Sequence, residues 1–284
     1  MNEKICLITG ANAGIGKSAA IEIAQKGFRV IIGCRNRVRG EEALKEIKAA
    51  SKNEDIDLQL IDLSSKKSIQ DAVNEYPHDH LDVLIHNAAD FDISRKKALA
   101  STDGVEAVWA TNHVGPVMLT QLLMDKLKAS KQARVITIAS KGLIMHPKQE
   151  VDLEDPEFKN RKFSISKAYY QSKLAQVMYT YWLAEELKDS DITVNCIRVT
   201  NVKIDMNRYP NVSKAAKLAY KLKSGSALTP ERMAKTYTFL ATSLNLKTTT
   251  GKYFDERNTI VDSSNYSKDP EKIKAVMDLT TKYI

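Results

Sequence analysis

Short apolar runs alternate with amphipathic stretches along most of the chain. Seven runs are predicted as strands because apolar and β-branched residues fill them: 4–10, 28–34, 57–63, 81–87, 133–140, 192–198 and 251–256. The stretches between them carry apolar residues at helical spacing and are predicted as helices: 16–27, 39–51, 64–76, 103–129, 164–188 and 229–243. Gly27 ends the first helix, serines cap the third, and Pro230 begins the last.

Continuous apolar strands that alternate with helices indicate a parallel sheet covered on both faces. Right-handed crossovers make this a doubly wound α/β sheet of about seven strands, the Rossmann fold. No repeat or linker divides the sequence, so residues 1–284 are predicted to form a single domain. Residues 199–228 fit the pattern least and are interpreted as an insertion that covers a substrate site.

Composition limits the cellular location and the partners that can be expected for the protein. No apolar run approaches the ~18 residues of a membrane span, and none resembles a secretory signal. The three cysteines lie in strand-like runs and indicate reduced thiols, which predicts a cytoplasmic protein. The net charge of +8 comes from lysines spread among glutamates, so it indicates a solvated surface and not a nucleic-acid partner.

The segment Thr9 to Gly16, "TGANAGIG", lies between a predicted strand and a predicted helix. In this context Gly10 allows a tight turn, Gly14 admits a pyrophosphate, and Gly16 lets the helix pack closely. The helix N-terminus would then bind the anion through free N–H groups. A purely structural turn is the alternative.

Polar residues at the ends of the next strands indicate which dinucleotide is expected to bind. NAD-binding folds carry an acidic residue at the end of the second strand, whereas here Arg35 follows it. Arg35 and Lys17 are two cations that suit the 2′-phosphate of NADP, with a solvated arginine as the alternative. Asp62 is placed to meet an adenine, and Asn87 lies on the same edge.

The stretch "SISKAYYQSKLAQ" raises the question of which tyrosine acts. A nearby ammonium stabilises a phenolate, and on a helix the neighbour lies at i+4. Tyr169 has Lys173 at this spacing, whereas Tyr170 has Leu174. Tyr169 and Lys173 are therefore the predicted pair, with an ordinary surface pair as the alternative.

Two residues from other segments complete the candidate set. Ser140 ends the fifth strand and could orient a substrate oxygen, or simply cap a turn. Asn112 lies inside a predicted helix, where asparagine is unfavourable. It therefore indicates a kink, a bound water or a functional contact.

Together these motifs resemble the short-chain dehydrogenase/reductase family. The chain carries T-G-x-x-x-G-I-G, a D-L pair at residues 62–63, an N-A pair at 87–88, and Y-x-x-x-K, in matching order over roughly residues 4–200. The segments "GANAGIGKSAA", "TNHVGPVMLT" and "YYQSKLAQV" look most similar to the retinol dehydrogenase and WW-domain oxidoreductase group. Unlike some members of that group, this chain is expected to carry no N-terminal membrane anchor and no WW domain.

The resemblance implies roles for these residues. Tyr169 would be the general acid/base, Lys173 would bind the nicotinamide ribose, Ser140 would orient the substrate, and Asn112 would support a water in a proton relay. The implied cofactor-binding residues are Gly10, Asn12, Ala13, Gly14, Ile15, Gly16, Arg35, Asp62, Leu63, Asn87, Ala88, Ala89, Tyr169, Lys173 and Thr200.

Two segments depart from the family pattern. The usual N-N-A-G reads His86-Asn87-Ala88-Ala89. After the sixth strand the family has Pro-Gly and then a threonine, whereas here Val199-Thr200 replaces Pro-Gly and Ile204 holds the threonine position. Thr200 could substitute for the missing threonine.

The predicted function is an NADP(H)-dependent oxidoreductase, with NADP(H) preferred over NAD(H), that interconverts a lipophilic carbonyl and an alcohol. A dinucleotide-binding scaffold with little turnover is the alternative, motivated by the missing Pro-Gly. The resemblance also implies a homodimer or homotetramer, although monomers occur in the group. No metal site is predicted, because His78 and His80 have no further ligands nearby.

Overall fold

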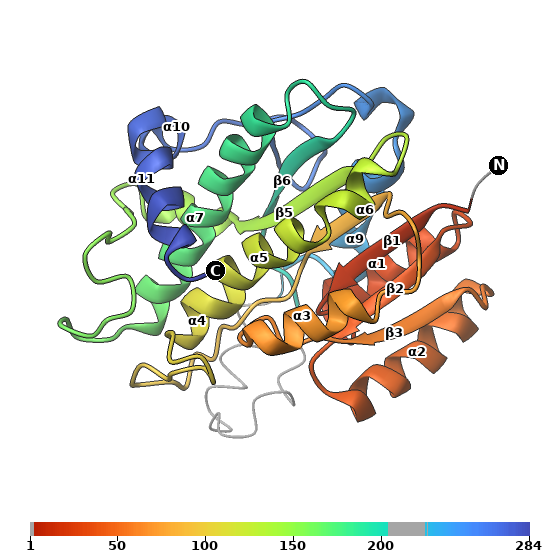
Figure 1. Cartoon of the computed structure of the whole chain (residues 1–284), viewed down its shortest axis with the longest axis horizontal. Coiled ribbons are helices and arrows are strands. Elements are labelled where there is room, and N and C mark those ends of the chain that lie inside the picture. Colours follow the sequence, from red (N-terminus) through yellow and green to blue (C-terminus); the bar gives the residue numbers. More distant parts are fainter. Residues whose placement is uncertain (1–2, 204–224, 226) are drawn as a thin grey trace.

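The centre of the molecule is one sheet of seven parallel strands, in the order β3-β2-β1-β4-β5-β6-β7 (Figure 1). The computed structural model describes residues 3–203, 225 and 227–284. The strands are β1 Ile5–Thr9, β2 Arg29–Cys34, β3 Ile56–Leu60, β4 Val83–His86, β5 Arg134–Ser140, β6 Thr193–Val199 and β7 Lys252–Phe254. All seven predicted strands are confirmed, as is the doubly wound order.

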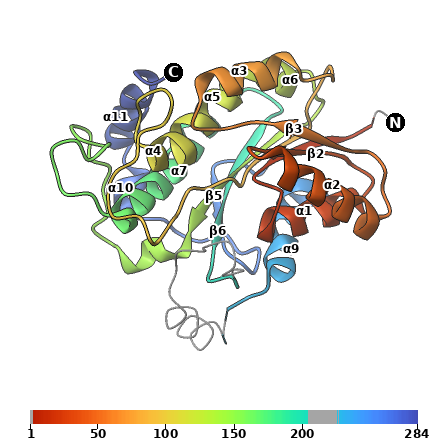
Figure 2. The ribbon, with the colours of Figure 1, turned by 90° about the horizontal axis from the view of Figure 1, so that it is seen from below.

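Helices cover both faces of this sheet. They are α1 Gly14–Ala24, α2 Arg37–Ser51, α3 Lys66–Asn74, α4 Ala107–Trp109, α5 Gly115–Leu122, α6 Met124–Lys128, α7 Ile165–Glu186, α9 Pro230–Thr242, α10 Asn265–Lys268 and α11 Pro270–Thr281. Figure 2 shows α1, α2 and α9 on one side of the sheet and α3 and α5 on the other, where α7 also packs. The sheet is therefore buried on both faces, as the continuous apolar runs predict.

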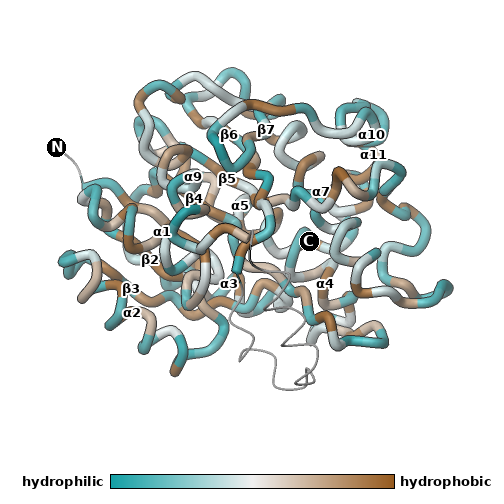
Figure 3. The backbone as a smooth tube through the Cα atoms, turned by 180° about the vertical axis from the view of Figure 1, so that it is seen from behind, coloured by the Kyte–Doolittle hydropathy of each residue, from teal (hydrophilic) through white to brown (hydrophobic). Residues whose placement is uncertain are grey.

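Successive side chains of a strand point to opposite faces of the sheet, so each strand contributes to the hydrophobic clusters on both faces. Leu7 packs into the cluster with α3, α5 and α7, and the next residue, Ile8, packs into the opposite cluster with α1 and α9. Each fully buried side chain of this size contributes about 1.5–3 kcal/mol. Hydrophobic stretches lie in the interior, and most outer loops are hydrophilic (Figure 3). Because all strands are parallel, their carboxyl ends lie along the same edge of the sheet.

The predicted helical stretch 103–129 is not one regular helix. It divides into α4, a π-helical turn at Ala110–Val114, α5 and α6. The π turn contains Asn112, so the irregularity that this residue indicates is observed at its position. Two helices that the hydrophobic pattern did not predict, α10 and α11, follow β7 and pack on α7.

The insertion predicted at 199–228 falls largely outside the described residues. Its described ends lie together, since Lys203 N donates to Leu228 O and Leu228 N donates to Asn201 O, at 2.9 and 3.0 Å. The sequence also predicts a short amphipathic helix at 213–223, and this stretch lies outside the described residues, as does Ile204.

Two general features concern the surroundings of the protein. Over the described part of the chain, no helix has both the length and the apolar character needed to cross a bilayer. All three cysteines are free and buried, with Cys6 on β1, Cys34 on β2 and Cys196 on β6.

Candidate active site

The glycine loop between β1 and α1 is closely packed. Gly10 and Gly14 have φ angles of 67° and 58°, in the left-handed region that favours glycine. A Cβ on Gly10 would lie 2.7 Å from Ala88 Cα, and one on Gly16 would lie 2.8 Å from Gly10 O and collide with the Asn87 amide. Gly10 and Gly16 therefore bring the loop, α1 and the end of β4 into direct contact.

The N-terminus of α1 is suited to an anion. Its N-cap, Ala13, makes no side-chain hydrogen bond to the helix, and no acidic residue lies in the first turn. The first N–H groups and the positive end of the helix dipole therefore face the glycine loop without a capping carboxylate. Asn12, Ala13 and Ile15, all half-buried, surround this position. The arrangement fits the pyrophosphate of a dinucleotide.

The residues expected at the adenosine end lie near one another. Arg35 Nε is 4.0 Å from Asp62 Oδ2, and the Arg35 side chain is 72% exposed. The Asp62 carboxylate accepts hydrogen bonds from the amide and hydroxyl of Ser64, which hold it in place. Lys17, the second predicted cation, instead forms an ion pair with Glu46 of α2. Arg35 is consequently the cation of this pair that faces Asp62.

Asn87 joins β4 to the glycine loop. Its Nδ2 donates to Thr9 O and Gly10 O, at 3.0 and 3.1 Å, and its Oδ1 accepts from the hydroxyl of Tyr237 at 3.1 Å. Tyr237 lies on α9, 150 residues away, and is fully buried. It fixes which end of the Asn87 amide faces the loop. No local signal in the sequence marks Tyr237, because the contact depends on α9 packing against α1.

The predicted pair Tyr169 and Lys173 lies on α7. Lys173 Nζ is 5.7 Å from the centre of the Tyr169 ring and donates to Ile138 O of β5 at 2.8 Å. Lys173 is 2% exposed, and burial lowers its pKa to about 8. A buried cation beside a phenol favours the phenolate. The arrangement can therefore support proton exchange at the Tyr169 hydroxyl.

Tyr170 has a different role, as its helix face predicts. Its ring fills the space beside Gly142, where a Cβ would lie 2.5 Å from ring atoms, and it packs against His146 with ring centres 4.2 Å apart. Tyr170 of α7 thus packs against the turn that follows β5.

Ser140 and Thr200 lie next to each other at the edge of the sheet. Ser140 pairs with Val199 in the β5–β6 register, so Thr200 is the first residue beyond that pair. Ser140 Oγ accepts from Gly142 N at 3.1 Å and caps the short 3-10 turn Lys141–Met145. A hydroxyl that accepts this bond can still donate its own hydrogen. Both interpretations of Ser140, as a cap and as a donor to substrate, are compatible with this geometry.

Asn112 holds a neighbouring loop through its side chain. Its Oδ1 accepts from Asp90 N at 2.6 Å, and its Nδ2 donates to Asp90 O and to Ser172 Oγ, both at 3.1 Å. Ser172 in turn donates to Tyr169 O at 2.7 Å. Asn112 therefore links the loop after β4 to the helical turn that carries Tyr169. The water relay expected of Asn112 stays a prediction.

The residue after Asn112 ties the π turn to the C-terminal helix. Thr280 Oγ1 donates to Val276 O, so His113 Nε2, 2.8 Å from Thr280 Oγ1, must be the donor in that bond. His113 Nδ1 is then an acceptor for Gln176 at 3.3 Å. Burial lowers the pKa of His113 to about 3 and keeps the ring neutral. α11 thereby supports the turn that carries Asn112.

Ion pairs surround the far end of the edge. Lys141 Nζ is 2.6 Å from Glu256 Oε1, and Arg198 Nη2 is 3.9 Å from Asp255 Oδ2. Burial alone would raise the pKa of Glu256, but the hydrogen bond from Lys141 lowers it. Two carboxylates that follow β7 thus bind cations beside Ser140 and Val199.

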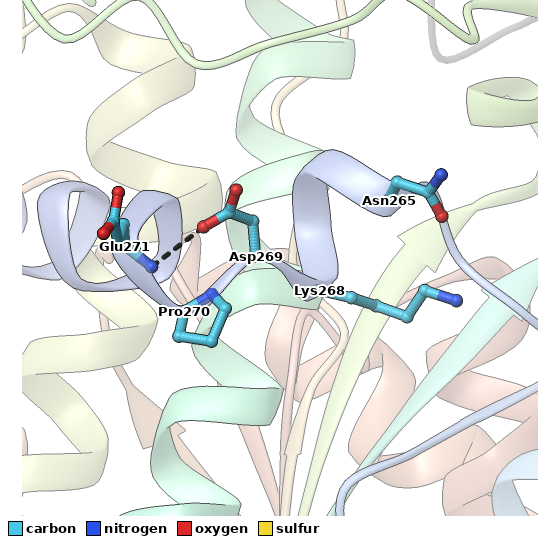
Figure 4. Close-up of a pocket in the computed structure, with 5 residues that line it drawn as sticks. All are labelled: Asn265, Lys268, Asp269, Pro270 and Glu271. Atoms are coloured by element: carbon cyan, nitrogen blue, oxygen red, sulfur yellow. Dashed lines mark hydrogen bonds between the residues drawn. The ribbon is translucent and has the colours of Figure 1, made fainter.

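One surface hollow lies away from this site. It lies at the junction of α10 and α11 and is lined by Asn265, Lys268, Asp269, Pro270 and Glu271 (Figure 4). The Asp269 carboxylate accepts from Glu271 N at 2.9 Å and so caps α11. The Asp269 carboxylate in this hollow therefore has a structural role.

Sequence comparison identifies the class of protein. The family model for short chain dehydrogenases matches residues 4–150. Mouse retinol dehydrogenase 13 is 34% identical over 257 residues, which cover 89% of this chain and 75% of the relative. The chain belongs to the short-chain dehydrogenase/reductase family, and it is an alcohol/carbonyl oxidoreductase that acts on CH–OH donors with NAD(P).

Within the family, this chain is similar to the retinol dehydrogenases. Human retinol dehydrogenase 12 is 34% identical over 255 residues, covering 89% of this chain and 78% of the relative. Retinol dehydrogenases 11 and 14 of the mouse are 32% and 33% identical. The similarity inferred from the motifs is therefore confirmed.

Solved structures share the fold at lower sequence identity. A crystal structure of a protein from Mycobacterium paratuberculosis has a TM-score of 0.75 at 24% identity, covering 98% of this chain and 92% of the other. A short-chain dehydrogenase from Shigella flexneri, complexed with NADP, has a TM-score of 0.68 at 22% identity, covering 90% and 98%.

Proposed function

We propose that the protein uses NADP(H) to interconvert a lipophilic aldehyde or ketone and the corresponding alcohol, with Tyr169 as the general acid/base. The observation that carries the proposal is the pairing of Tyr169 with a buried Lys173 whose pKa is lowered to about 8. Support for the substrate class comes from the similarity to retinol dehydrogenases. Buried free cysteines suit a reducing compartment, so the cytoplasm belongs to the proposal.

The residues present fit a dinucleotide. The glycine loop turns at Gly10 and Gly14, whose φ angles lie in the left-handed region, and the uncapped start of α1 faces this loop. Arg35 would contact the 2′-phosphate, Asp62 and Leu63 would lie at the adenine, and Asn87, Ala88 and Ala89 would line the path toward Lys173. When bound, NADPH would supply the hydride.

Side chains of the protein would stabilise the negative charge that develops on the substrate oxygen and supply its proton. As hydride adds to the carbonyl carbon, the Tyr169 and Ser140 hydroxyls donate hydrogen bonds to the oxygen, where negative charge develops. Tyr169 gives its proton to that oxygen, and the alcohol forms. The Lys173 ammonium stabilises the remaining phenolate until a proton returns from solvent. Reduction is the proposed direction because cellular NADP is largely reduced, a family-level expectation.

Turnover with a matched variant tests the chemistry. Purified protein is mixed with NADPH and a panel of lipophilic aldehydes, ketones and quinones, and the absorbance of reduced nicotinamide is followed. Tyr169→Phe removes the hydroxyl and should lower kcat at least ~100-fold, whereas Tyr170→Phe should retain most activity. Cofactor binding with no turnover across the panel would instead support the scaffold, which the Val199-Thr200 departure motivates.

The cofactor preference has a separate test. Arg35→Ala should weaken NADPH binding at least ~10-fold, because it removes the charge-assisted contact to the 2′-phosphate. NADH binding, measured by the same fluorescence titration, should change little. Equal losses for both cofactors would contradict the phosphate contact, and Arg37→Ala serves as the control on the same surface.

A further inference from the structure

Phe91, in the loop after β4, packs against the ring of Tyr169. The ring centres are 4.2 Å apart and the ring planes are inclined by 35°. Phe91 is half-buried and belongs to none of the hydrophobic clusters formed by the described residues. Its packing contact is therefore with the proposed acid/base and not with the core of the domain.

The residue before Phe91 is fixed by two independent sets of bonds. The Asn112 amide binds both the N–H and the carbonyl of Asp90. The Asp90 carboxylate accepts two hydrogen bonds from the Arg95 guanidinium, at 2.7 and 3.0 Å. Both side chains of this pair are mostly buried, at 16% exposed for Arg95 and 21% for Asp90. Such a bidentate pair fixes geometry as well as charge.

The residue after Phe91 is also fixed. Asp92 Oδ1 accepts from the amide and the hydroxyl of Ser94, at 2.9 and 2.6 Å. Hydrogen bonds to Ser94 lower the pKa of Asp92, with burial acting in the opposite direction. Phe91 thus lies between Asp90, which is anchored to Asn112 and Arg95, and a local turn formed by Asp92 and Ser94. Its ring contacts that of Tyr169. We call residues 90–95 the aromatic strap.

The position of the strap limits what can approach Tyr169. A substrate oxygen that takes the Tyr169 proton must come within hydrogen-bond distance of its hydroxyl. The ring surface covered by Phe91 is closed to the substrate. Tyr170 lies on another side of Tyr169, with ring centres 5.4 Å apart and planes inclined by 70°. Two aromatic side chains, Phe91 and Tyr170, therefore lie against the Tyr169 ring.

We propose that Phe91 determines the size of substrate that reaches Tyr169, and that the Asp90–Arg95 pair acts as its positioning device. The site accepts slender or flat carbonyl compounds and excludes those with bulky groups next to the carbonyl. This inference rests on the proposed function, because it concerns the same carbonyl site.

Substrate selectivity measures the effect directly. The values of kcat/KM with NADPH are determined for hexanal, which is slender, and 2-adamantanone, which is bulky. Phe91→Ala should raise the ratio of 2-adamantanone to hexanal at least ~10-fold, since one or two methylenes in a pocket are worth that much. Phe91→Leu should give an intermediate ratio. Phe239→Ala, a half-buried phenylalanine on α9, is the matched control and should leave the ratio unchanged.

The arginine provides an independent test of positioning. Arg95→Met removes the guanidinium but keeps a long side chain, so Phe91 is released without being shortened. The selectivity ratio should move in the same direction as in Phe91→Ala, by a smaller factor. Arg95→Lys, which keeps the charge but not the planar fork, should lie between Arg95→Met and the native protein. An unchanged ratio in Arg95→Met would overturn the role of the pair.

A binding measurement separates this inference from the proposed function. In a Tyr169→Phe background loaded with NADPH, 2-adamantanone and hexanal are titrated by calorimetry. Adding Phe91→Ala should strengthen the binding of 2-adamantanone relative to that of hexanal at least ~10-fold. A ratio that stays within twofold, or one that Phe239→Ala shifts equally, would overturn the role of Phe91. Absent turnover in the native protein would overturn the proposed function alone, since the binding ratio needs no chemistry.

Discussion

The carboxyl edge of the sheet is held together differently on its two sides. On the β1–β4 side, close backbone contacts and neutral hydrogen bonds join Gly10, Gly16 and Asn87. On the β5–β7 side, the ion pairs Lys141–Glu256 and Arg198–Asp255 join the strands to the segment after β7. The two sides meet at Lys173, which bonds to β5.

The difference bears on one of the two departures from the family pattern, since the other, Ala89, follows β4 on the close-packed side. A close backbone contact leaves no room for an added methyl group, so the glycine loop keeps its residue types. Charged side chains reach their partners over several rotatable bonds and tolerate other backbones. Pro-Gly is replaced by Val199-Thr200 on this second side, beside Arg198. The departure is consistent with an edge stabilised by side chains.

The largest effect is expected from Gly16→Ala, which tests the close-packed side. The new Cβ would collide with the Asn87 amide and lie 2.8 Å from Gly10 O. Overpacking of this kind costs about 1–3 kcal/mol, and NADPH affinity should fall at least ~10-fold because the loop must shift. Fluorescence titration and thermal unfolding measure the two effects. Gly225→Ala, where a Cβ meets nothing within 4 Å, is the control. Native-like affinity in Gly16→Ala would contradict the packing argument.

Lys173→Met tests the boundary between the two sides. The pKa of Lys173 is about 8 in the folded protein and about 10.5 when unfolded, so burial of the charged form opposes folding below pH 8. The variant should lose activity and yet unfold with a free energy up to roughly 3 kcal/mol larger at pH 7.

The stability difference between Lys173→Met and the native protein should depend on pH. Between pH 8 and 10.5 the unfolded state binds more protons than the folded state, so the native protein gains stability as the pH rises. The advantage of Lys173→Met should therefore shrink over this window in urea-unfolding curves. A constant difference would show that Lys173 is buried without a pKa shift.

Asp255→Asn tests the ion-paired side. It leaves the largely buried Arg198 without its carboxylate, whereas the acceptor that binds Arg257 N and Thr259 N is retained. We expect a loss of about 2 kcal/mol of unfolding free energy. Glu256→Gln should cost less than about 1 kcal/mol, because Lys141 is 40% exposed and can be solvated. The reverse order would contradict the view that burial sets the strength of these pairs.

The smallest effect concerns two buried histidines, His86 on the β4 side and His113 on the π turn. Each has a pKa lowered to about 3 by burial, so the unfolded state binds more protons as the pH falls below 6.5. Between pH 7 and 5.5 each should cost about 1 kcal/mol of stability. In denaturant unfolding, the stability of His86→Asn should therefore fall by about 1 kcal/mol less than that of the native protein over this pH range. An identical decline in the variant would show that His86 binds protons equally in the folded and unfolded states, so that burial does not lower its pKa.

Much of the fold could be predicted because its signals are local. Apolar runs such as 133–140 are long enough to mark strands, and Pro230 and Gly27 mark helix ends. The π turn in 103–129 was indicated only by Asn112. The helices α10 and α11 were not predicted, although Asp269-Pro270 begins α11 in the same way as Thr229-Pro230 begins α9.

The candidate site divides in the same way. Tyr169 and Lys173 follow from spacing along one helix, and the glycine loop follows from its place between a strand and a helix. Tyr237, Ser172 and Phe91 could not be assigned, because their contacts are with residues distant in sequence or on another element. Lys17 was assigned to the phosphate, although α2 places Glu46 beside it.

The sequence by itself determined the order of strands and helices, the glycine loop and the tyrosine–lysine pair, because backbone periodicity and tight turns are properties of neighbouring residues. Only the tertiary structure decided how the edge is held: by Tyr237 behind Asn87, by the aromatic strap over Tyr169, and by carboxylates opposite Lys141 and Arg198. The reason is physical. Burial and partner choice depend on which elements pack together, and side chains far apart in the chain acquire their hydrogen bonds, charges and pKa values only once they do.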